Sequence, residues 1–190
     1  MLNCRLVYPR NKGFTLIELI LWLALFSILA TSFLSLLNYV NHLIYIGDKE
    51  DEVLLNGKYG FEFIKKEVSS ADKIIPSYRI ENLNFQYPSN IGFVILTISQ
   101  EDRKDNYNYS TYYLREDELR RISTNQDSSK YPKSNDFSGY NQICTRVVDL
   151  SKTKLDTQKK IIDLKLYMGC KDIETKVFET RIFIRCPIDG

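Results

Sequence analysis

Few side chains in this sequence have the types and spacings needed to catalyse a reaction or bind a metal. The single histidine, His42, has no Cys or acidic residue at metal-ligand spacing. The sequence also contains no Gly-rich phosphate loop and no Ser nucleophile elbow. The acidic cluster Asp102–Asn106 lacks the spacing of a calcium-binding loop and carries two cations, so we expect a solvated turn there. We therefore predict a protein that is not an enzyme, with no catalytic residue, no metal site and no cofactor.

Glu18 is the charged residue that most needs an explanation. It opens an uncharged run, Leu19–Leu37, that contains no Pro and no Gly. A carboxylate well inside a bilayer costs about 2.5–3.5 kcal/mol. Either Glu18 stays hydrated near the interface, or a positive partner meets it within the apolar phase.

The run that follows Glu18 is long enough to cross a membrane. Its length corresponds to roughly 29 Å of helix, close to the bilayer core of about 30 Å. Arg5, Arg10 and Lys12 precede it without any acidic residue, which predicts a single-pass membrane protein with a cytoplasmic N-terminus. A secretory signal peptide has a shorter apolar region, and a lipoprotein signal would place Cys4 after that region.

The chain as a whole is balanced in charge. The 26 Lys and Arg residues are nearly cancelled by 24 acidic residues, so binding of nucleic acid through bulk charge is not implied. Hydrophobic residues make up 44% of the 190 residues, which is enough apolar material for a folded core and argues against disorder.

The stretch Lys12–Leu19, KGFTLIEL, resembles the type IV prepilin signal almost letter for letter. In that family a membrane peptidase cuts after the Gly and methylates the new N-terminal amine. The resemblance implies a leader peptide of residues 1–13, cleavage between Gly13 and Phe14, and N-methylation of Phe14. Glu18 then becomes the fifth residue of the mature chain, where the family carries its characteristic Glu.

The physical chemistry of these residues agrees with that resemblance. Cleavage leaves a positive amine four residues before Glu18, on the same helix face, and the helix dipole favours a carboxylate near the N-terminus. In a filament, the amine of one subunit can meet Glu18 of a neighbour, so that the pairing sets the stagger between subunits. Gly13 lets the scissile backbone enter a tight protease site.

The long helix is expected to have two parts. Residues 14–46 are predicted to form the transmembrane helix, and residues 47–75 its amphipathic continuation, which we expect to pack on the protein's own sheet. An apolar stripe with alternating spacings of three and four supports the second part: Leu54, Gly57, Phe61, Ile64, Val68, Ala71 and Ile75. Gly47, at the junction of the two parts, is where we expect bending or melting.

Residues 76–190 are predicted to form a β-rich soluble head domain. The expected strands are Phe93–Ile98, Ile143–Leu150, Ile161–Met168 and Glu174–Arg185, with a hairpin of Tyr107–Leu114 and Leu119–Ser123 that turns at Glu116 and Asp117. Residues 124–142 are expected to form a long loop. Strict alternation predicts an antiparallel sheet with one covered and one wetter face, and the helix is the natural cover. The fold class is α+β, pilin-like.

Cysteines and tyrosines in the head leave alternatives open. Maturation would remove Cys4, and an outside location permits a disulfide. If Ile143–Leu150 pairs with Ile161–Met168, Cys144 and Cys170 approach each other, whereas Cys186 lies too far from Cys170 to bridge; free buried thiols are the alternative. The cluster Tyr107, Tyr109, Tyr112 and Tyr113 is explained better by sheet packing than by an adhesive surface.

The sequence therefore favours a minor pilin, a structural and assembly subunit of a type IV pilus. Its expected partners are other pilin subunits, the prepilin peptidase and the inner-membrane assembly platform, and its expected location is the cell membrane before assembly and an extracellular filament afterwards. The stretch Phe61–Ala71 is similar to the larger minor pilins compared with the J component of type II secretion. The alternatives are a pseudopilin of a type II secretion or competence DNA-uptake system, and a permanently anchored, adhesin-like ectodomain.

Overall fold

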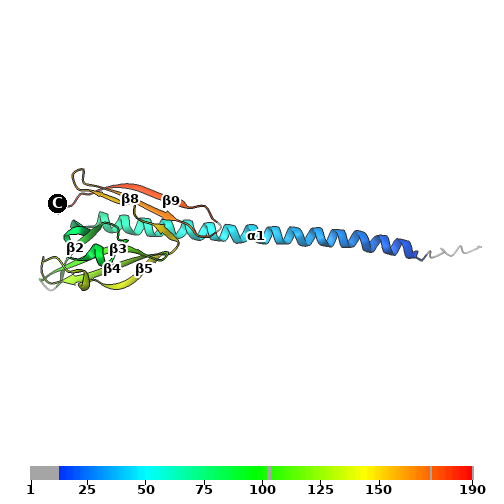
Figure 1. Ribbon diagram of the computed structural model, residues 1–190, viewed down its shortest axis with the longest axis horizontal. Helices are drawn as coiled ribbons and strands as arrows, with labels where there is room; N and C mark the ends of the chain where they lie inside the picture. The colour runs from blue at the N-terminus through cyan, green and yellow to red at the C-terminus, as the bar shows by residue number, and fades with distance from the viewer. Residues whose placement is uncertain (1–12, 102–103, 172, 190) are drawn as a thin grey trace, which may run out of the picture. The chain divides into compact units, whose positions relative to one another are not determined.

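A computed structural model describes residues 13–101, 104–171 and 173–189. Its first element is the helix α1, Leu16–Ser69, and the rest of the chain is mostly β-structure (Figure 1). The chain divides into two compact units, Met1–Tyr45 and Ile46–Gly190, so α1 contributes to both. The cluster Asp102–Asn106, expected to be a solvated turn, lies partly outside the described residues.

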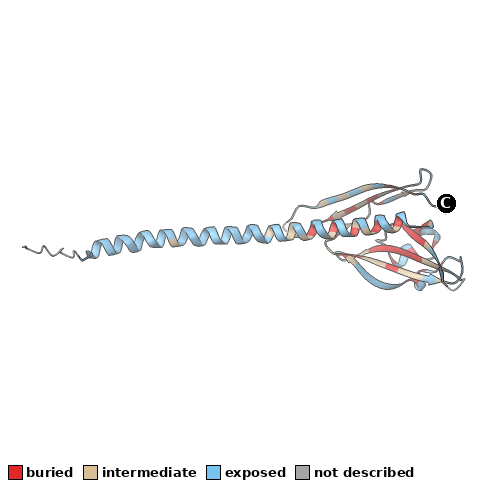
Figure 2. Ribbon diagram, turned by 180° about the vertical axis from the view of Figure 1, so that it is seen from behind, coloured by how far each residue is buried: buried red, intermediate tan, exposed pale blue. Residues whose placement is uncertain are grey.

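The first unit contains the helical residues 16–45, almost all of which expose their side chains (Figure 2). Trp22 is 65% exposed and Phe26 is 69% exposed, for example. The backbone hydrogen bonds are therefore satisfied within the helix, but most of its apolar side chains stay uncovered within the unit.

The helix ends at Ser69, earlier than the predicted Ile75, because the chain turns there to join a sheet. The backbone N–H of Asp72 donates to the carbonyl of Leu96 (2.9 Å), and the Asp72 carboxylate accepts from the N–H of Ile98 (2.6 Å). The strand β1, Lys73–Pro76, follows at once and pairs with the residues that begin the next strand. Ile75, which precedes a proline, also disfavours helical backbone.

Five antiparallel strands form the first sheet, called sheet A, in the order β1-β2-β3-β4-β5. Its other strands are β2 (Phe93–Glu101), β3 (Lys104–Arg115), β4 (Glu118–Gln126) and β5 (Ser138–Cys144). The predicted hairpin is confirmed: Arg115 pairs with Glu118, and Glu116 at the turn has φ 59°.

Two expectations in this region are wrong. Residues 124–142 are not one loop, because β4 runs on to Gln126 and β5 begins at Ser138; the short 3₁₀ helix η2, Ser134–Asp136, lies between them. The predicted strand Ile143–Leu150 is divided between β5 and β6, Val147–Asp149. Arg146, between the two, has φ 64°, a left-handed conformation that interrupts a strand.

A second sheet, called sheet B, is built around β8, Ile161–Met168, whose predicted bounds are confirmed. The strand β9, Lys176–Phe183, pairs with β8 along its whole length. The strand β6 pairs near one end of β8, and β7, Lys154–Asp156, pairs near the other. The pairing between the Ile143–Leu150 region and Ile161–Met168, on which the candidate disulfide depended, occurs at Val147 and Met168.

The part of α1 from Ile46 lies between the two sheets, rather than on one sheet as predicted (Figures 1 and 2). Its buried residues are Val53, Gly57, Gly60, Ile64 and Val68. The predicted stripe is confirmed at Gly57, Ile64 and Val68, but Leu54 is 44% exposed and Ala71 and Ile75 follow the helix. Val53 and Gly60 are buried because sheets cover the helix on two sides.

Sheet A is covered on its other face as well, whereas the expected alternation of a covered and a wetter face is confirmed in sheet B, where buried and partly exposed residues alternate along β8. A second apolar cluster includes Leu83, Tyr87, Tyr109 and Phe137. The covering residues come from the short helix α2, Leu83–Gln86, from its neighbouring 3₁₀ helix η1, Ser77–Arg79, and from the approach to β5. Tyr109 and Tyr112 are fully buried, as sheet packing predicts for this cluster.

Candidate functional site

The start of α1 is organised by Thr15 and Glu18. The backbone N–H and the hydroxyl of Thr15 both donate to Oε2 of Glu18, each at 2.9 Å. The N–H of Glu18 donates back to the Thr15 hydroxyl at 3.4 Å. This reciprocal arrangement is a capping box, which satisfies backbone donors at a helix N-terminus.

The capping box leaves the residues in front of it unwound and accessible. Gly13 and Phe14 have no regular secondary structure and are exposed, and Phe14 is 77% exposed. A Cβ placed on Gly13 would meet nothing within 4 Å, so no packing within the described residues requires a glycine there. A protease needs access to its substrate backbone, and the exposed, non-helical Gly13 and Phe14 offer this immediately before a fixed helix start.

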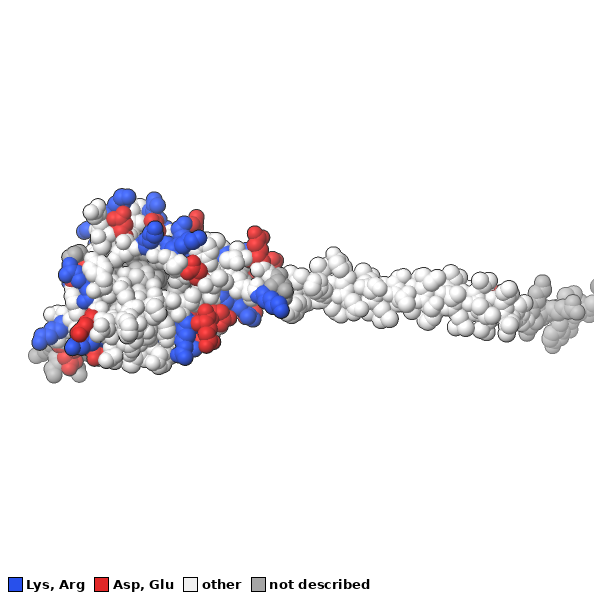
Figure 3. Space-filling model, in the orientation of Figure 1, with Lys and Arg blue, Asp and Glu red and all other residues white. Residues whose placement is uncertain are grey.

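After Glu18 the helix carries no Asp, Glu, Lys or Arg until Asp48. Figure 3 shows this segment as an uncharged surface, whereas charged groups are spread over the head. Its most apolar window has a mean hydropathy of 2.3, and none of that window is buried. Among the described residues, this is the one helix long and apolar enough to cross a membrane.

Three hydroxyl groups in this segment are satisfied within the helix itself. Ser27 donates to the carbonyl of Ala24 (2.8 Å), and Ser32 donates to that of Ile28 (2.8 Å). Thr31 donates to the carbonyls of Ser27 and Ile28. Since lipid offers no hydrogen bonds, such internal pairing removes the penalty of these groups in an apolar phase.

A family model, the prokaryotic N-terminal methylation motif, matches residues 8–34. The motif is that of the type IV pilin family. It covers Gly13 and Phe14, the capping box and most of the uncharged run, and it leaves the head unmatched. No curated protein and no solved structure matches the chain. With the α+β architecture, this gives the chain a pilin-type signal and a pilin-like fold.

The other residues considered from sequence contribute no second centre in this pilin-like chain. His42 is exposed on the apolar helix, and no group of metal-ligating side chains occurs among the described residues. The candidate disulfide between Cys144 and Cys170 is not formed, since both are free, as is Cys186. Cys144 packs its Sγ against α1 at Gly60, where a Cβ would lie only 2.5 Å away. Cys4 lies outside the described residues.

Sequence reasoning missed two parts of the arrangement. Thr15 belongs to the capping box, and the pattern of a Thr three residues before a Glu was the signal that could have found it. Glu67 joins α1 to sheet A by accepting from Arg121 Nε (2.8 Å) and from the hydroxyl of Tyr112. No local pattern indicates this role of Glu67, because its partners lie more than forty residues away in the sequence.

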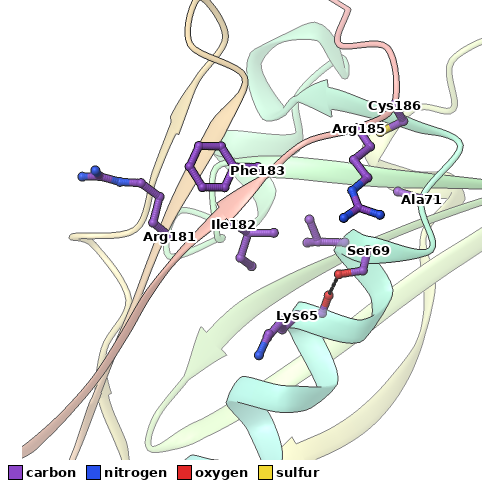
Figure 4. A pocket seen from close by; sticks show the side chains of 9 residues that line it. Lys65, Ser69, Ala71, Arg181, Ile182, Phe183, Arg185 and Cys186 are labelled. Carbon is purple, nitrogen blue, oxygen red and sulfur yellow. Dashed lines mark hydrogen bonds between the residues drawn. The ribbon is translucent and has the colours of Figure 1, made fainter.

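A hollow of about 300 Å³ lies beside the end of α1 (Figure 4). Arg181 and Lys65 at its edge are already paired with Asp163 and Glu62. Figure 4 shows Arg185 pointing toward the last turn of α1, near Ser69. A cation at this place is attracted to the partial negative charge of the helix C-terminus, and this attraction stabilises the helix by about 0.3–1 kcal/mol. We assign Arg185 to helix stabilisation.

Proposed function

We propose that this protein is a minor pilin, made as a membrane-anchored precursor and assembled into a type IV pilus through its apolar N-terminal helix. The observation that carries the proposal is the pilin-type motif in its structural context. An exposed, unwound Gly13–Phe14 bond precedes a capped helix that carries no charge for about eight turns after Glu18.

The proposed processing follows from that context. The peptidase removes residues 1–13 and methylates the amine of Phe14. Residues 14–46 hold the subunit in the membrane, with the leader in the cytoplasm, until the assembly platform extracts it into the filament. The chain is thus the substrate of an enzyme and performs no catalysis of its own.

Glu18 is proposed to direct assembly. In the precursor its carboxylate is occupied by Thr15. Cleavage creates a positive amine at Phe14, and an amine brought by a neighbouring subunit can compete for the exposed carboxylate. Inside an apolar filament core an unpaired carboxylate is costly, so the pairing favours the correct stagger between subunits.

The deciding experiment is the intact mass of the protein from cells with and without the prepilin peptidase. We expect peptidase-dependent loss of residues 1–13 and the addition of one methyl group to the new N-terminus. A chain that begins at Met1 in both strains would contradict the proposal and would favour a permanently anchored ectodomain.

Two variants separate processing from assembly. Gly13→Leu should block cleavage, because a branched side chain at the scissile residue obstructs a tight protease site. Glu18→Ala should still be cleaved but should be lost from sheared filaments, whereas the exposed acid variant Glu62→Ala should enter filaments normally. Equal incorporation of both acid variants would refute the role of Glu18.

A further inference from the structure

We propose that the head binds a neutral oligosaccharide in two adjoining hollows that share Gln86. One hollow, of about 380 Å³, is bordered by Tyr87, Tyr113 and Tyr140. The other, of about 370 Å³, is bordered by Asn82, Phe85 and Asn135. Volumes of this size are typical of small-molecule sites. The proposal concerns the outer cover of sheet A and does not depend on filament assembly.

The first hollow has a firm aromatic floor. The ring centroids of Tyr87 and Tyr113 are 4.8 Å apart, and the planes of the two rings are inclined at 57°. Tyr87 is 7% exposed and Tyr113 is 6% exposed. Tyr140, on β5, is 65% exposed and borders the same hollow. The three phenols are close enough to influence one another, since burial raises the pKa of Tyr87 and the neighbouring Tyr140 and Tyr113 raise it further.

The second hollow presents a phenyl ring to water. Phe85 is 90% exposed, although Leu83 and Tyr87, two positions to either side, are buried. The short helix α2 therefore anchors its other face to sheet A and turns Phe85 outward. Because the ring is exposed at the border of a hollow, covering it with a bound ligand would remove apolar area from water.

Asn90 holds this surface in place before any ligand arrives. Its amide nitrogen donates to Asn84 Oδ1 (2.9 Å) and to the carbonyl of Tyr87 (2.7 Å). Its oxygen accepts from the N–H of Gly92 (2.8 Å). A preorganised surface loses less entropy on binding, which favours affinity for a small ligand.

The chemistry of the lining selects the ligand class. Apart from Arg115, the residues around both hollows are aromatic, amide, hydroxyl, Pro or Leu, with no acid among them. Pyranose rings match this lining, because their C–H faces lie well on the negative face of an aromatic ring and their hydroxyls pair with amides. A quaternary ammonium ligand also favours aromatic rings, but Arg115 would repel it.

Two hollows joined at Gln86 fit a chain of sugars better than a single sugar. One ring can stack on Tyr140 and the next on Phe85, with the shared amide of Gln86 between them. We therefore expect affinity to rise from monosaccharides to oligosaccharides of the same sugar, because each additional stacked ring adds contact area without a second loss of translational freedom.

The test uses the full-length chain in a detergent that contains no sugar, applied to an array of neutral and acidic oligosaccharides, with phosphocholine included. We expect retention on at least one series of neutral oligosaccharides. Tyr140→Ala and Phe85→Ala should each weaken binding at least tenfold, whereas Tyr59→Ala, which removes a ring 58% exposed on α1, should not. All three side chains are exposed, so melting temperatures should stay close to that of the parent.

Several results would overturn the proposal. These are no retention on any neutral oligosaccharide, retention that Tyr140→Ala and Phe85→Ala leave unchanged, or retention on phosphocholine alone. Equal loss of binding in Tyr59→Ala would also refute it, because the effect would then not belong to the two hollows.

Discussion

Glu67 is a carboxylate whose partners come from the sheet rather than from its own helix. It accepts from Arg121 Nε (2.8 Å), from Ser110 Oγ (3.4 Å) and from the hydroxyl of Tyr112. Tyr112 is fully buried, and burial and the charge of Glu67 raise the pKa of its phenol. The phenol therefore stays neutral and acts as a donor, so that a charged residue can lie at the helix–sheet contact.

Tyr112→Phe should lower the free energy of unfolding by about 1–3 kcal/mol, because a partly buried carboxylate loses a donor while the ring is kept. Urea denaturation measures the change. Tyr78→Phe, at a residue 67% exposed, is the matched control and should change stability by less than about 0.5 kcal/mol. Equal effects of the two variants would show that the Tyr112 hydroxyl contributes nothing specific.

The buried thiol of Cys144 is expected to lower the free energy of unfolding at alkaline pH. Burial raises the pKa of its thiol from 9.0 to about 12. The unfolded thiol ionises first, so the unfolded state is favoured as the pH rises from 9.0 toward about 12, and the stabilising contribution is complete below that window. Denaturation curves at pH ~8 and ~10.5 should show a smaller decrease for Cys144→Ala than for the parent chain. Identical decreases would mean that the thiol is not protected by burial.

At the scale of elements, α1 approaches both sheets closely through glycine. A Cβ on Gly57 would lie 2.3 Å from the Phe178 ring of β9, and one on Gly60 would lie 2.5 Å from Cys144 Sγ of β5. Glycine lowers helix propensity by about 1 kcal/mol relative to Ala. In α1 this loss of helix propensity is offset by close packing against two sheets. A larger residue at either position would push the helix away from the sheet that it contacts.

Gly60→Ala and Gly47→Ala should therefore have opposite effects. A Cβ added at Gly47 would meet nothing within 4 Å, so Ala there should stabilise the helix by up to about 1 kcal/mol. Gly60→Ala should destabilise the protein by about 1–3 kcal/mol, because Cys144 is buried and has little room to move. Thermal unfolding of the two variants gives the sign, and stabilisation by Gly60→Ala would rule out the proposed close contact.

At the scale of the whole molecule, the two units differ in what they bury. Both apolar clusters consist of residues from Val53 onward, whereas helical residues before Ile46 expose their apolar side chains. The second unit thus has a core of its own. The first unit instead exposes an apolar surface that its own residues do not cover, as expected of a helix that enters a membrane.

Residues 46–190 expressed alone should fold without detergent and unfold cooperatively, since no residue of either apolar cluster is removed. Circular dichroism during heating checks this, with sedimentation as a measure of solubility. The full chain without detergent is the comparison and should aggregate. A non-cooperative transition of the fragment would show that the head needs the first part of α1.

Much of this organisation can be recognised from residues that are neighbours in the sequence. The prepilin-type stretch around Gly13, the uncharged run after Glu18 and the alternation in Ile161–Met168 each depend on neighbouring residues, so they can be recognised from sequence. The hairpin at Glu116 is equally local. These features predicted a membrane segment and a processing site, and they determined the α+β class and one complete strand.

Tertiary structure decided what depends on distant partners. The helix ends at Ser69 because Asp72 bonds with Leu96 and Ile98, and α1 lies between two sheets because Gly57 and Gly60 admit β9 and β5. The free thiol of Cys144 packs against α1 because Gly60 leaves room for it. Such contacts join residues far apart in the chain, and their geometry depends on how whole elements pack, which no local pattern specifies.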